Sequence, residues 1–278
     1  MTVTCMIGGT SPSDRAALDY ACSLARRLGQ PITGLCAFPD PTTALIYATS
    51  PYMIGVGGPA LDRVREAQET LIQDCQSMCE EVVSNAGLTD KSSFITETNL
   101  PARAAVAAAT LAEAMVFPHE VGTGEHVLGE AFERTMMDSA LPVVTAAAEM
   151  TETGRALIAW DGSPQAARAV RLHLPLLKVM DEVVIAQNPD DMSELTAQNP
   201  AASPDTLSAW LSQRGIANST VSFSGPVAKG LVDTAGQNRC EMIVSGAYGS
   251  SRAGEMLFGG ATRGLLKAGG AVALALAH

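Results

Sequence analysis

Short apolar runs alternate along the chain with longer segments in which apolar residues recur at helical spacing. This alternation predicts strands that are followed by helices. The run of residues 2–9 ends in glycines, the segment 11–29 has the helical pattern, and residues 31–38 form a second apolar run. Either Ser11 or Ser13 is a candidate N-cap for the intervening helix. The chain is therefore expected to begin with a strand, a helix and a second strand.

The same order of elements recurs in the second half of the chain. A Ser-Pro dipeptide follows the first strand in both halves, at Ser11–Pro12 and at Ser163–Pro164. Each half also ends in a short apolar run after a helical segment, at 139–148 and at 269–278. The repeat spans about 130–150 residues, which is the size of a domain rather than of a solenoid unit.

We therefore expect two tandem domains, residues 1–150 and residues 151–278, with their boundary within 148–156. The strand runs are apolar throughout, which is typical of parallel strands covered on both faces. The pattern predicts an α/β fold with two Rossmann-like domains, each an open, mostly parallel five-stranded sheet with helices on both faces.

Two longer segments, 38–62 and 188–205, follow the second strand of their halves and read as loops, each with room for a short helix. Loops at this position lie over the ligand crevice of an open α/β sheet. Each segment is therefore a candidate lid, and the alternative is a surface or dimer-contact loop.

Composition and charge narrow the class of protein. The chain has 278 residues, of which 47% are hydrophobic and 17% charged, as expected for a globular protein with a large core. The net charge of −11 and the lack of a basic cluster argue against nucleic-acid binding. No apolar run reaches the length of a membrane span, and the N-terminus lacks the basic segment of a signal peptide, so we expect a cytoplasmic protein with no membrane partner.

The cysteines do not point to zinc, because none of the six belongs to a CxxC pair and no histidine cluster accompanies them. Cys75 and Cys79 are four residues apart and would share one face of a helix. They are either a redox pair or two partly buried small apolar residues.

The strongest local signal is a glycine-rich stretch near the C-terminus. Gly246 follows an apolar strand, Gly249 comes three residues later, and Gly259 and Gly260 stand directly before a helical pattern. Glycines leave backbone N–H groups accessible, and a helix N-terminus favours an anion through its unpaired donors and its dipole. This arrangement predicts a phosphate-binding site.

The first strand of the second half ends in AWDGS, which places Asp161 at a carboxyl end of the sheet. Its carboxylate is suited to accept hydrogen bonds from ribose hydroxyls or an adenine edge, although an N-cap of the next helix is the alternative. The ring of Trp160 either stacks on a base or is buried in the core.

With these motifs, the sequence resembles the universal stress protein family, in two tandem copies of which only the second carries the family's glycine motif. That motif is Gly, two residues, Gly, nine residues, Gly, then Ser or Thr; here Gly260 stands at the hydroxyl position, and Thr262 is a substitute donor. The resemblance implies an adenine nucleotide alpha hydrolase-like fold that binds ATP or AMP. The candidate binding residues are Ala159, Trp160, Asp161, Asn188, Ser245, Gly246, Gly249, Arg252, Gly259, Gly260, Ala261 and Thr262.

The first half lacks this motif. Alignment on its last strand places Phe117, Glu120 and Glu130 where the second half has Gly246, Gly249 and Gly259, with Ala131 at Gly260, and the Ser-Pro match places Gly9 at Asp161. Carboxylates near a phosphate would repel it. We therefore expect a degenerate domain that keeps the fold and has lost nucleotide binding.

The loop that replaces the motif has a second interpretation. His119, His126, Glu120 and Glu125 could together form a metal site, and a solvated loop is the alternative. The resemblance further implies that the last strands of the two halves pair within one chain as a pseudo-dimer, and a homodimer of whole chains is also conceivable.

The sequence has no catalytic motif such as GxSxG or HExxH, and no catalytic residue is assigned. His173 lies in a predicted helix and is expected to be partly buried. Mg²⁺ could accompany the phosphates together with Asp161, and Arg252 is either a phosphate ligand or a solvated loop charge.

These features favour a regulatory stress-response protein that binds an adenine nucleotide. The alternatives are an interaction scaffold that needs no nucleotide, and a slow ATPase or adenylyl-transfer enzyme with Arg252 and Arg263 near the phosphates.

Overall fold

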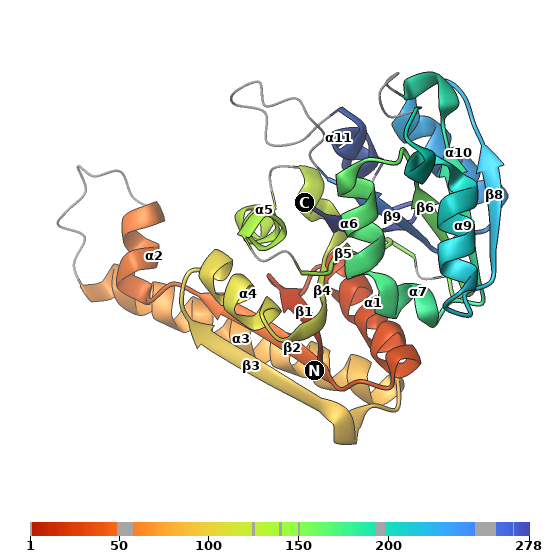
Figure 1. The fold of residues 1–278 in the computed structure, drawn as a ribbon. Helices are drawn as coiled ribbons and strands as arrows, with labels where there is room; N and C mark the ends of the chain where they lie inside the picture. The colour runs from red at the N-terminus through yellow and green to blue at the C-terminus, as the bar shows by residue number, and fades with distance from the viewer. Residues whose placement is uncertain are drawn as a thin grey trace.

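The computed structural model shows an α/β protein built around one continuous sheet (Figure 1). It describes residues 2–48, 58–123, 126–138, 141–149, 151–192, 198–247, 260–268 and 270–278. In the first half the elements are β1 (Thr2–Ile7), α1 (Pro12–Leu28), β2 (Ile32–Phe38), α2 (Pro41–Ala48), α3 (Gly58–Asn85), η1 (Thr89–Lys91), β3 (Ser92–Thr98), α4 (Pro101–Ala109), β4 (Ala112–Phe117), η2 (His119–Thr123), α5 (Gly129–Asp138) and β5 (Val143–Thr145).

The second half repeats this plan, with shorter helices after its first two strands. Its elements are β6 (Arg155–Ala159), α6 (Pro164–Leu172), α7 (Leu174–Lys178), β7 (Glu182–Gln187), η3 (Pro189–Asp191), η4 (Pro200–Ala202), α9 (Pro204–Ser212), β8 (Asn218–Ser222), α10 (Val227–Gln237), β9 (Met242–Gly246), α11 (Gly260–Lys267) and β10 (Ala273–Ala277).

The repeated Ser-Pro dipeptides are helix starts. Ser11 caps α1 in a capping box with Asp14, and Ser163 caps α6 by accepting a hydrogen bond from the N–H of Ala166. The following proline takes the first helical position, where its missing N–H costs no hydrogen bond. Of the two caps considered for the first helix, Ser11 is therefore the correct one.

The strand order is the same in both halves, β3-β2-β1-β4-β5 and β8-β7-β6-β9-β10, and every described pair within a half is parallel. The halves join through their last strands: β5 and β10 pair antiparallel, with Val144 opposite Ala275. The expected pairing of the two halves is confirmed, and it merges the two five-stranded sheets into one sheet of ten strands. The joint protects apolar edges that would otherwise be prone to aggregation.

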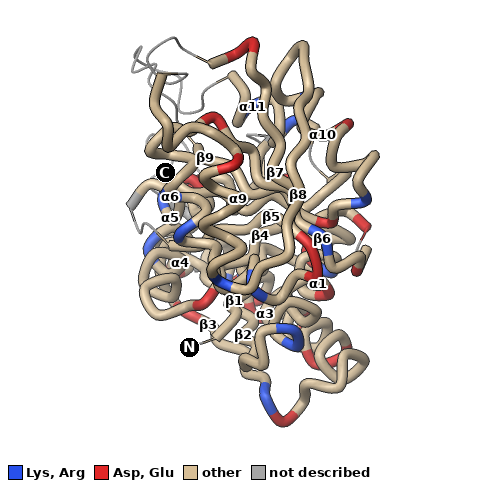
Figure 2. Tube along the Cα trace, turned by 45° about the vertical axis from the view of Figure 1, so that its right-hand side comes forward, with Lys and Arg blue, Asp and Glu red and all other residues tan. Residues whose placement is uncertain are grey.

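Helices cover both faces of this sheet, and each face has its own core. Alternate strand residues separate the two cores; Val3 and Cys5 lie in one and Met6 in the other. One face carries α1, α3, α6, α7 and α9, and the other carries α4, α5, α10 and α11. Figure 2 shows charged residues of both signs interspersed over the helices and loops, while β5, β9 and β10 at the joint contain none.

The segments that read as loops are partly helical. Within 38–62, Pro41–Ala48 forms α2 and Gly58 begins the 28-residue helix α3. The segment 188–205 contains the short helical turns η3 and η4 and the start of α9. The remainder of each segment lies outside the described residues.

The burial of three side chains can be compared with what the sequence predicted for them. Cys75 and Cys79 are both buried in the core beneath α3, as in the packing interpretation, and burial raises the pKa of Cys79 to about 11. His173 is fully buried rather than partly buried.

No helix in the described part of the chain is both long and apolar enough to span a membrane.

Candidate functional site

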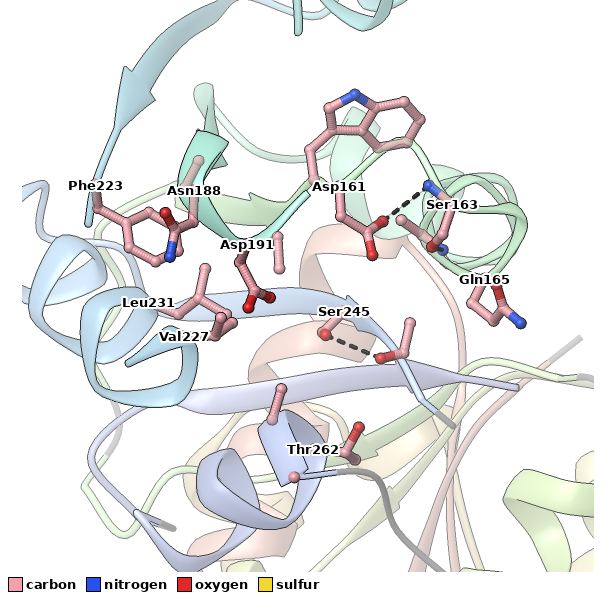
Figure 3. Close-up of a pocket in the computed structure, with 17 residues that line it drawn as sticks. Asp161, Ser163, Gln165, Asn188, Asp191, Phe223, Val227, Leu231, Ser245 and Thr262 are labelled. Atoms are coloured by element: carbon pink, nitrogen blue, oxygen red, sulfur yellow. Dashed lines mark hydrogen bonds between the residues drawn. The ribbon is translucent and has the colours of Figure 1, made fainter. Parts of the chain in front are cut away.

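A cavity of about 290 Å³ opens at the carboxyl ends of β6, β7 and β9, where the strand order reverses around β6 (Figure 3). Its walls come from these strand ends and from the first turns of α6, α10 and α11. Such a switch point is the usual ligand position in an open α/β sheet.

The structure brings the predicted residues together at this cavity wherever it describes them. These residues are Ala159, Trp160, Asp161, Asn188, Ser245, Gly246, Gly260, Ala261 and Thr262. The other three candidates, Gly249, Arg252 and Gly259, lie outside the described residues.

Asp161 lies in the turn between β6 and α6. Its Oδ1 accepts a hydrogen bond of 2.8 Å from the N–H of Ser163, and Ser163 is the residue that caps α6. The N-cap alternative for Asp161 is therefore wrong. The hydrogen bond fixes the carboxylate, which is exposed and directed into the cavity (Figure 3).

Trp160 is only 7% exposed and packs in the core shared with α6 and α9. Its Nε1–H donates a 2.8 Å hydrogen bond to the carbonyl of Ala202, which also accepts one from the Gln187 side chain. The buried interpretation of Trp160 is thus correct, and stacking of its ring on a base is not supported. The bond instead fixes the end of segment 188–205 against β6 and β7.

Asn188 is buried and connects two walls of the cavity. Its Nδ2 donates to the carbonyl of Gly225, which precedes α10, and its Oδ1 accepts from the N–H of Asp190. The side chain amide therefore holds η3 and the start of α10 in place. Figure 3 shows it beside the ring of Phe223.

Sequence reasoning missed two groups of side chains that line the cavity, an apolar wall and a second carboxylate. Phe223, Val227 and Leu231 form an apolar wall, and Asp191 adds a second carboxylate. Val227 and Leu231 are one helical turn apart at the start of α10, so helical periodicity could have placed them on one face. Asp191 follows a loop proline and gives no such signal.

Glycine is required at position 246 by the packing of β9 against α6, as well as by the access of a ligand to the backbone. A Cβ atom there would lie 2.8 Å from the carbonyl carbon of Gln165 and 2.9 Å from the nitrogen of Ala166. Both are backbone atoms of α6, so they cannot move aside cheaply. Glycine therefore lets the end of β9 approach the first turn of α6.

The N-terminus of α11 faces the cavity. Gly260, Ala261 and Thr262 are its first three residues, whose N–H groups have no acceptor within the helix. A Cβ atom at Gly260 would meet no atom within 4 Å among the described residues. The side chain of Thr262 also lines the cavity, as Figure 3 shows. This end of the cavity has the polarity and space to hold an anion.

The charged side chains that line the cavity within the described ranges are both acidic. They are Asp161 and Asp191, and no lysine, arginine or histidine of the described chain joins them. An anionic ligand must therefore be held mainly by backbone donors in this part of the site.

In the first half, the corresponding space is filled by side chains. A Cβ atom on Gly8 would lie 2.9 Å from Val127 and 3.1 Å from Leu128, and Phe117 at the end of β4 packs edge-on against Phe132 at 5.6 Å. The carboxylate of Asp14 accepts hydrogen bonds from the N–H groups of Gly8 and Ser11 and thereby occupies the donors near the start of α1.

In the predicted acidic loop of the first half, Glu120 stays half-exposed and contacts neighbouring side chains. Glu120 accepts a 2.7 Å hydrogen bond from Ser13 and lies 4.0 Å from His126, whose Nδ1 accepts from the N–H of Leu128. Glu125, the fourth member of the suggested metal site, is outside the described residues. Within those residues no group of three or more His, Cys, Asp or Glu side chains is arranged to hold a metal ion.

Comparison with known proteins agrees with this architecture. Residues 152–269 match the model of the Universal stress protein family. A universal stress protein from Archaeoglobus fulgidus DSM 4304 has a similar solved structure, with a TM-score of 0.64 and 16% identity over 99% of this chain and 95% of that one.

A second similar structure is that of a Pseudomonas aeruginosa UCBPP-PA14 protein assigned to the same family. Its TM-score is 0.52 and its identity 12%, over 99% of this chain and 91% of that one. No curated protein sequence matches the chain significantly. Residues 152–269 therefore match the universal stress protein family, and the chain as a whole has a fold similar to that of the universal stress protein from Archaeoglobus fulgidus.

Proposed function

We propose that residues 151–278 bind an adenine nucleotide, ATP or AMP, in the cavity at the ends of β6 and β9, and that this binding regulates a stress response. The observation that carries the proposal is the N-terminus of α11, which presents backbone donors to a cavity that also has an apolar wall and two carboxylates. The match of residues 152–269 to the universal stress protein family supports the same conclusion.

The walls of the cavity differ in a way that suits the parts of a nucleotide. The base packs against Phe223, Val227 and Leu231, because these side chains form the apolar wall. The phosphates lie at Gly260 and Ala261, where N–H groups and the helix dipole stabilise negative charge. Asp161 accepts a hydrogen bond from the sugar between them.

Binding rather than catalysis is favoured by the chemistry of the lining residues. The described part of the lining contains no histidine, cysteine, lysine or arginine that could act on a phosphate. Mg²⁺ would enter with the phosphates and supply the positive charge that the described lining lacks.

The first half supports this site without binding a nucleotide itself. Its own crevice is filled by side chains, and its η2 segment packs on α11, where a Cβ atom at Gly122 would be 2.7 Å from the Cβ of Leu266. Packing is therefore its proposed role.

A matched pair of glycine substitutions tests the site. Gly260 and Gly236 both lie in helices, and a Cβ atom on either meets nothing within 4 Å among the described residues, but only Gly260 lines the cavity. By calorimetry, Gly260→Glu should weaken ATP and AMP binding at least tenfold, because its carboxylate occupies the anion site. Gly236→Glu should bind like the unmodified protein.

Equal affinity in both variants would place the nucleotide elsewhere. If neither ATP nor AMP binds the unmodified chain or raises its thermal midpoint at millimolar concentration, the scaffold alternative holds instead. Phosphate or pyrophosphate release, measured in the same samples, would indicate enzymatic turnover. Mass spectrometry of nucleotide extracted from the native protein distinguishes ATP from AMP.

A further inference from the structure

We infer that Asp191 determines the sugar specificity of the cavity by accepting a hydrogen bond from a ribose hydroxyl, opposite Asp161. This inference rests on the proposed function and extends it from a nucleotide in general to ribonucleotides with free 2′- and 3′-hydroxyls. No motif in the sequence marks Asp191, and its position comes from the fold alone.

The role inferred for Asp191 follows from the order of groups along a nucleotide. In any nucleotide the sugar stands between the base and the phosphates. Figure 3 shows Asp191 between Asp161 and the side chains of Val227 and Leu231, with Ser245 below it. Since the apolar side chains suit the base and the N-terminus of α11 suits the phosphates, the space flanked by Asp161 and Asp191 is the place of the sugar.

The backbone around Asp191 is held in place. Its N–H donates to the carbonyl of Asn188, and the buried Asn188 side chain accepts from the N–H of Asp190. Asn188 also donates to Gly225, so η3 is tied to the segment that begins α10. Asp191 is therefore presented to the cavity by a fixed turn rather than by a loose loop.

The carboxylate of Asp191 has no protein partner within the described part of the chain. No hydrogen bond or ion pair engages it there, whereas one oxygen of Asp161 already accepts from Ser163. An ionised carboxylate accepts hydrogen bonds and donates none. The two hydroxyls of ribose are donors that fit a pair of such acceptors.

Two kinds of analogue should then be rejected. A deoxyribose lacks one donor, so one carboxylate loses its hydrogen bond. A phosphate on the 2′- or 3′-oxygen brings negative charge next to both carboxylates, which repel it. The cavity is thus expected to discriminate against nucleotides that are phosphorylated on the sugar.

The experiment measures affinity for ATP, 2′-deoxy-ATP and 3′-deoxy-ATP by calorimetry in the full chain, or for the AMP series if AMP binds more tightly. The unmodified protein should bind one deoxy analogue roughly 10- to 100-fold more weakly than the parent, the range expected for a hydrogen bond to a charged group. In Asp191→Ala this ratio should fall to about one. The ratio is informative because the lost charge changes the affinity for all three ligands alike.

Asp190→Ala is the matched control. Asp190 is the adjacent exposed aspartate of η3, it does not line the cavity, and its removal changes the net charge equally. This variant should keep the full discrimination. Both substitutions are at exposed positions, and unchanged thermal midpoints will show that both variants are folded.

The possible failures are distinguishable. If no nucleotide binds the unmodified protein, the proposed function itself is rejected, and this inference with it. If nucleotides bind and Gly260→Glu abolishes binding, but Asp191→Ala keeps the ratios of the unmodified protein, the proposed function stands and the role of Asp191 is rejected. Equal affinity of the unmodified protein for all three ligands also overturns it.

Discussion

Arg27 and Glu241 form an ion pair that joins the two halves of the molecule. Arg27 lies in the last turn of α1 in the first half, and Glu241 precedes β9 in the second. Their side chains are 19% and 3% exposed. The second oxygen of Glu241 accepts hydrogen bonds from the N–H groups of Thr153 (2.6 Å) and Gly154 (2.9 Å), so one carboxylate holds both α1 and the linker between the halves.

Removal of this carboxylate should destabilise the whole chain. Glu241→Ala leaves a part-buried guanidinium and two linker N–H groups without their acceptor, and a loss of about 3 kcal/mol in the free energy of unfolding is expected. Urea denaturation measures it. Glu81→Ala is the control, because it removes the exposed ion pair with Arg15 and should hardly move the midpoint. Similar midpoints for both variants would show that the interdomain pair is not important for stability.

The contact between Gly122 and Leu266 should couple the first half to the proposed nucleotide site. Gly122→Ala introduces a methyl group that overlaps Leu266, so α11 must shift and nucleotide binding should weaken severalfold, although residue 122 does not line the cavity. In Gly122→Ala/Leu266→Gly the Cβ atom that the new methyl group meets is removed and the overlap is relieved, so the two changes should be non-additive. Calorimetry and denaturation of both single variants and the double variant check this. Strict additivity would rule out the coupling.

Mg²⁺ should strengthen the binding of ATP more than that of AMP. The described lining of the cavity carries two carboxylates and no cationic side chain, so the phosphates of ATP need a counter-charge that the ligand must bring with it. AMP has fewer phosphate charges and depends less on the metal. Titrations with Mg²⁺ and with EDTA measure the difference. An ATP affinity that is independent of Mg²⁺ would indicate that a protein cation outside the described residues neutralises the phosphates.

Stability should fall with acidification through the histidine that is buried between α6 and α7. Burial lowers the pKa of His173 to about 4, whereas the unfolded chain has an ordinary value of about 6.5. Below pH 6.5 the unfolded state takes up a proton that the native state does not bind. Stability is therefore complete above that pH and is lost progressively as the pH falls to about 4, by up to about 3 kcal/mol.

The measurement is the pH dependence of urea unfolding in the unmodified protein and in His173→Gln. The variant should lack the part of the pH dependence that lies between pH 6.5 and 4, while the carboxylate contribution remains in both proteins. Parallel pH profiles would show that His173 is protonated at the same pH in the folded and unfolded chains.

The fold could be predicted largely from local signals. The Ser-Pro pairs mark helix starts through capping, a local interaction, and the apolar strand runs record burial on both faces. The antiparallel joint between β5 and β10 was predicted only through the resemblance to a family. The short helix allowed for in 38–62 is α2, but the start of the long helix α3 at Gly58 was not predicted, because the Pro and Gly residues of this segment were read as loop signals.

The glycines and the aspartate of the cavity could be predicted, because their positions after strands and before helices mark them in the sequence. Lining residues that depend on contacts between distant helices and strands could not be predicted. Gly260 and Asp161 reach the cavity as expected. The burial of Trp160 depends on the carbonyl of Ala202, 42 residues away, and the apolar wall requires the end of β8 to lie beside α10. Such contacts depend on tertiary structure and leave no periodic pattern in the sequence.

Because β5 and β10 are antiparallel, the strands of the two halves point in opposite directions at the joint. In the first half, Phe117 at the end of β4 pairs with Thr145 at the carboxyl end of β5. In the second half, Gly246 at the end of β9 pairs with Ala277 of β10. Ala277 follows Leu276, which pairs with Val143 at the amino end of β5. At the joint, the two halves therefore present their strand carboxyl ends on opposite rims of the common sheet. A molecule that bound to the rim of the first half would therefore lie away from the mouth of the cavity in the second half.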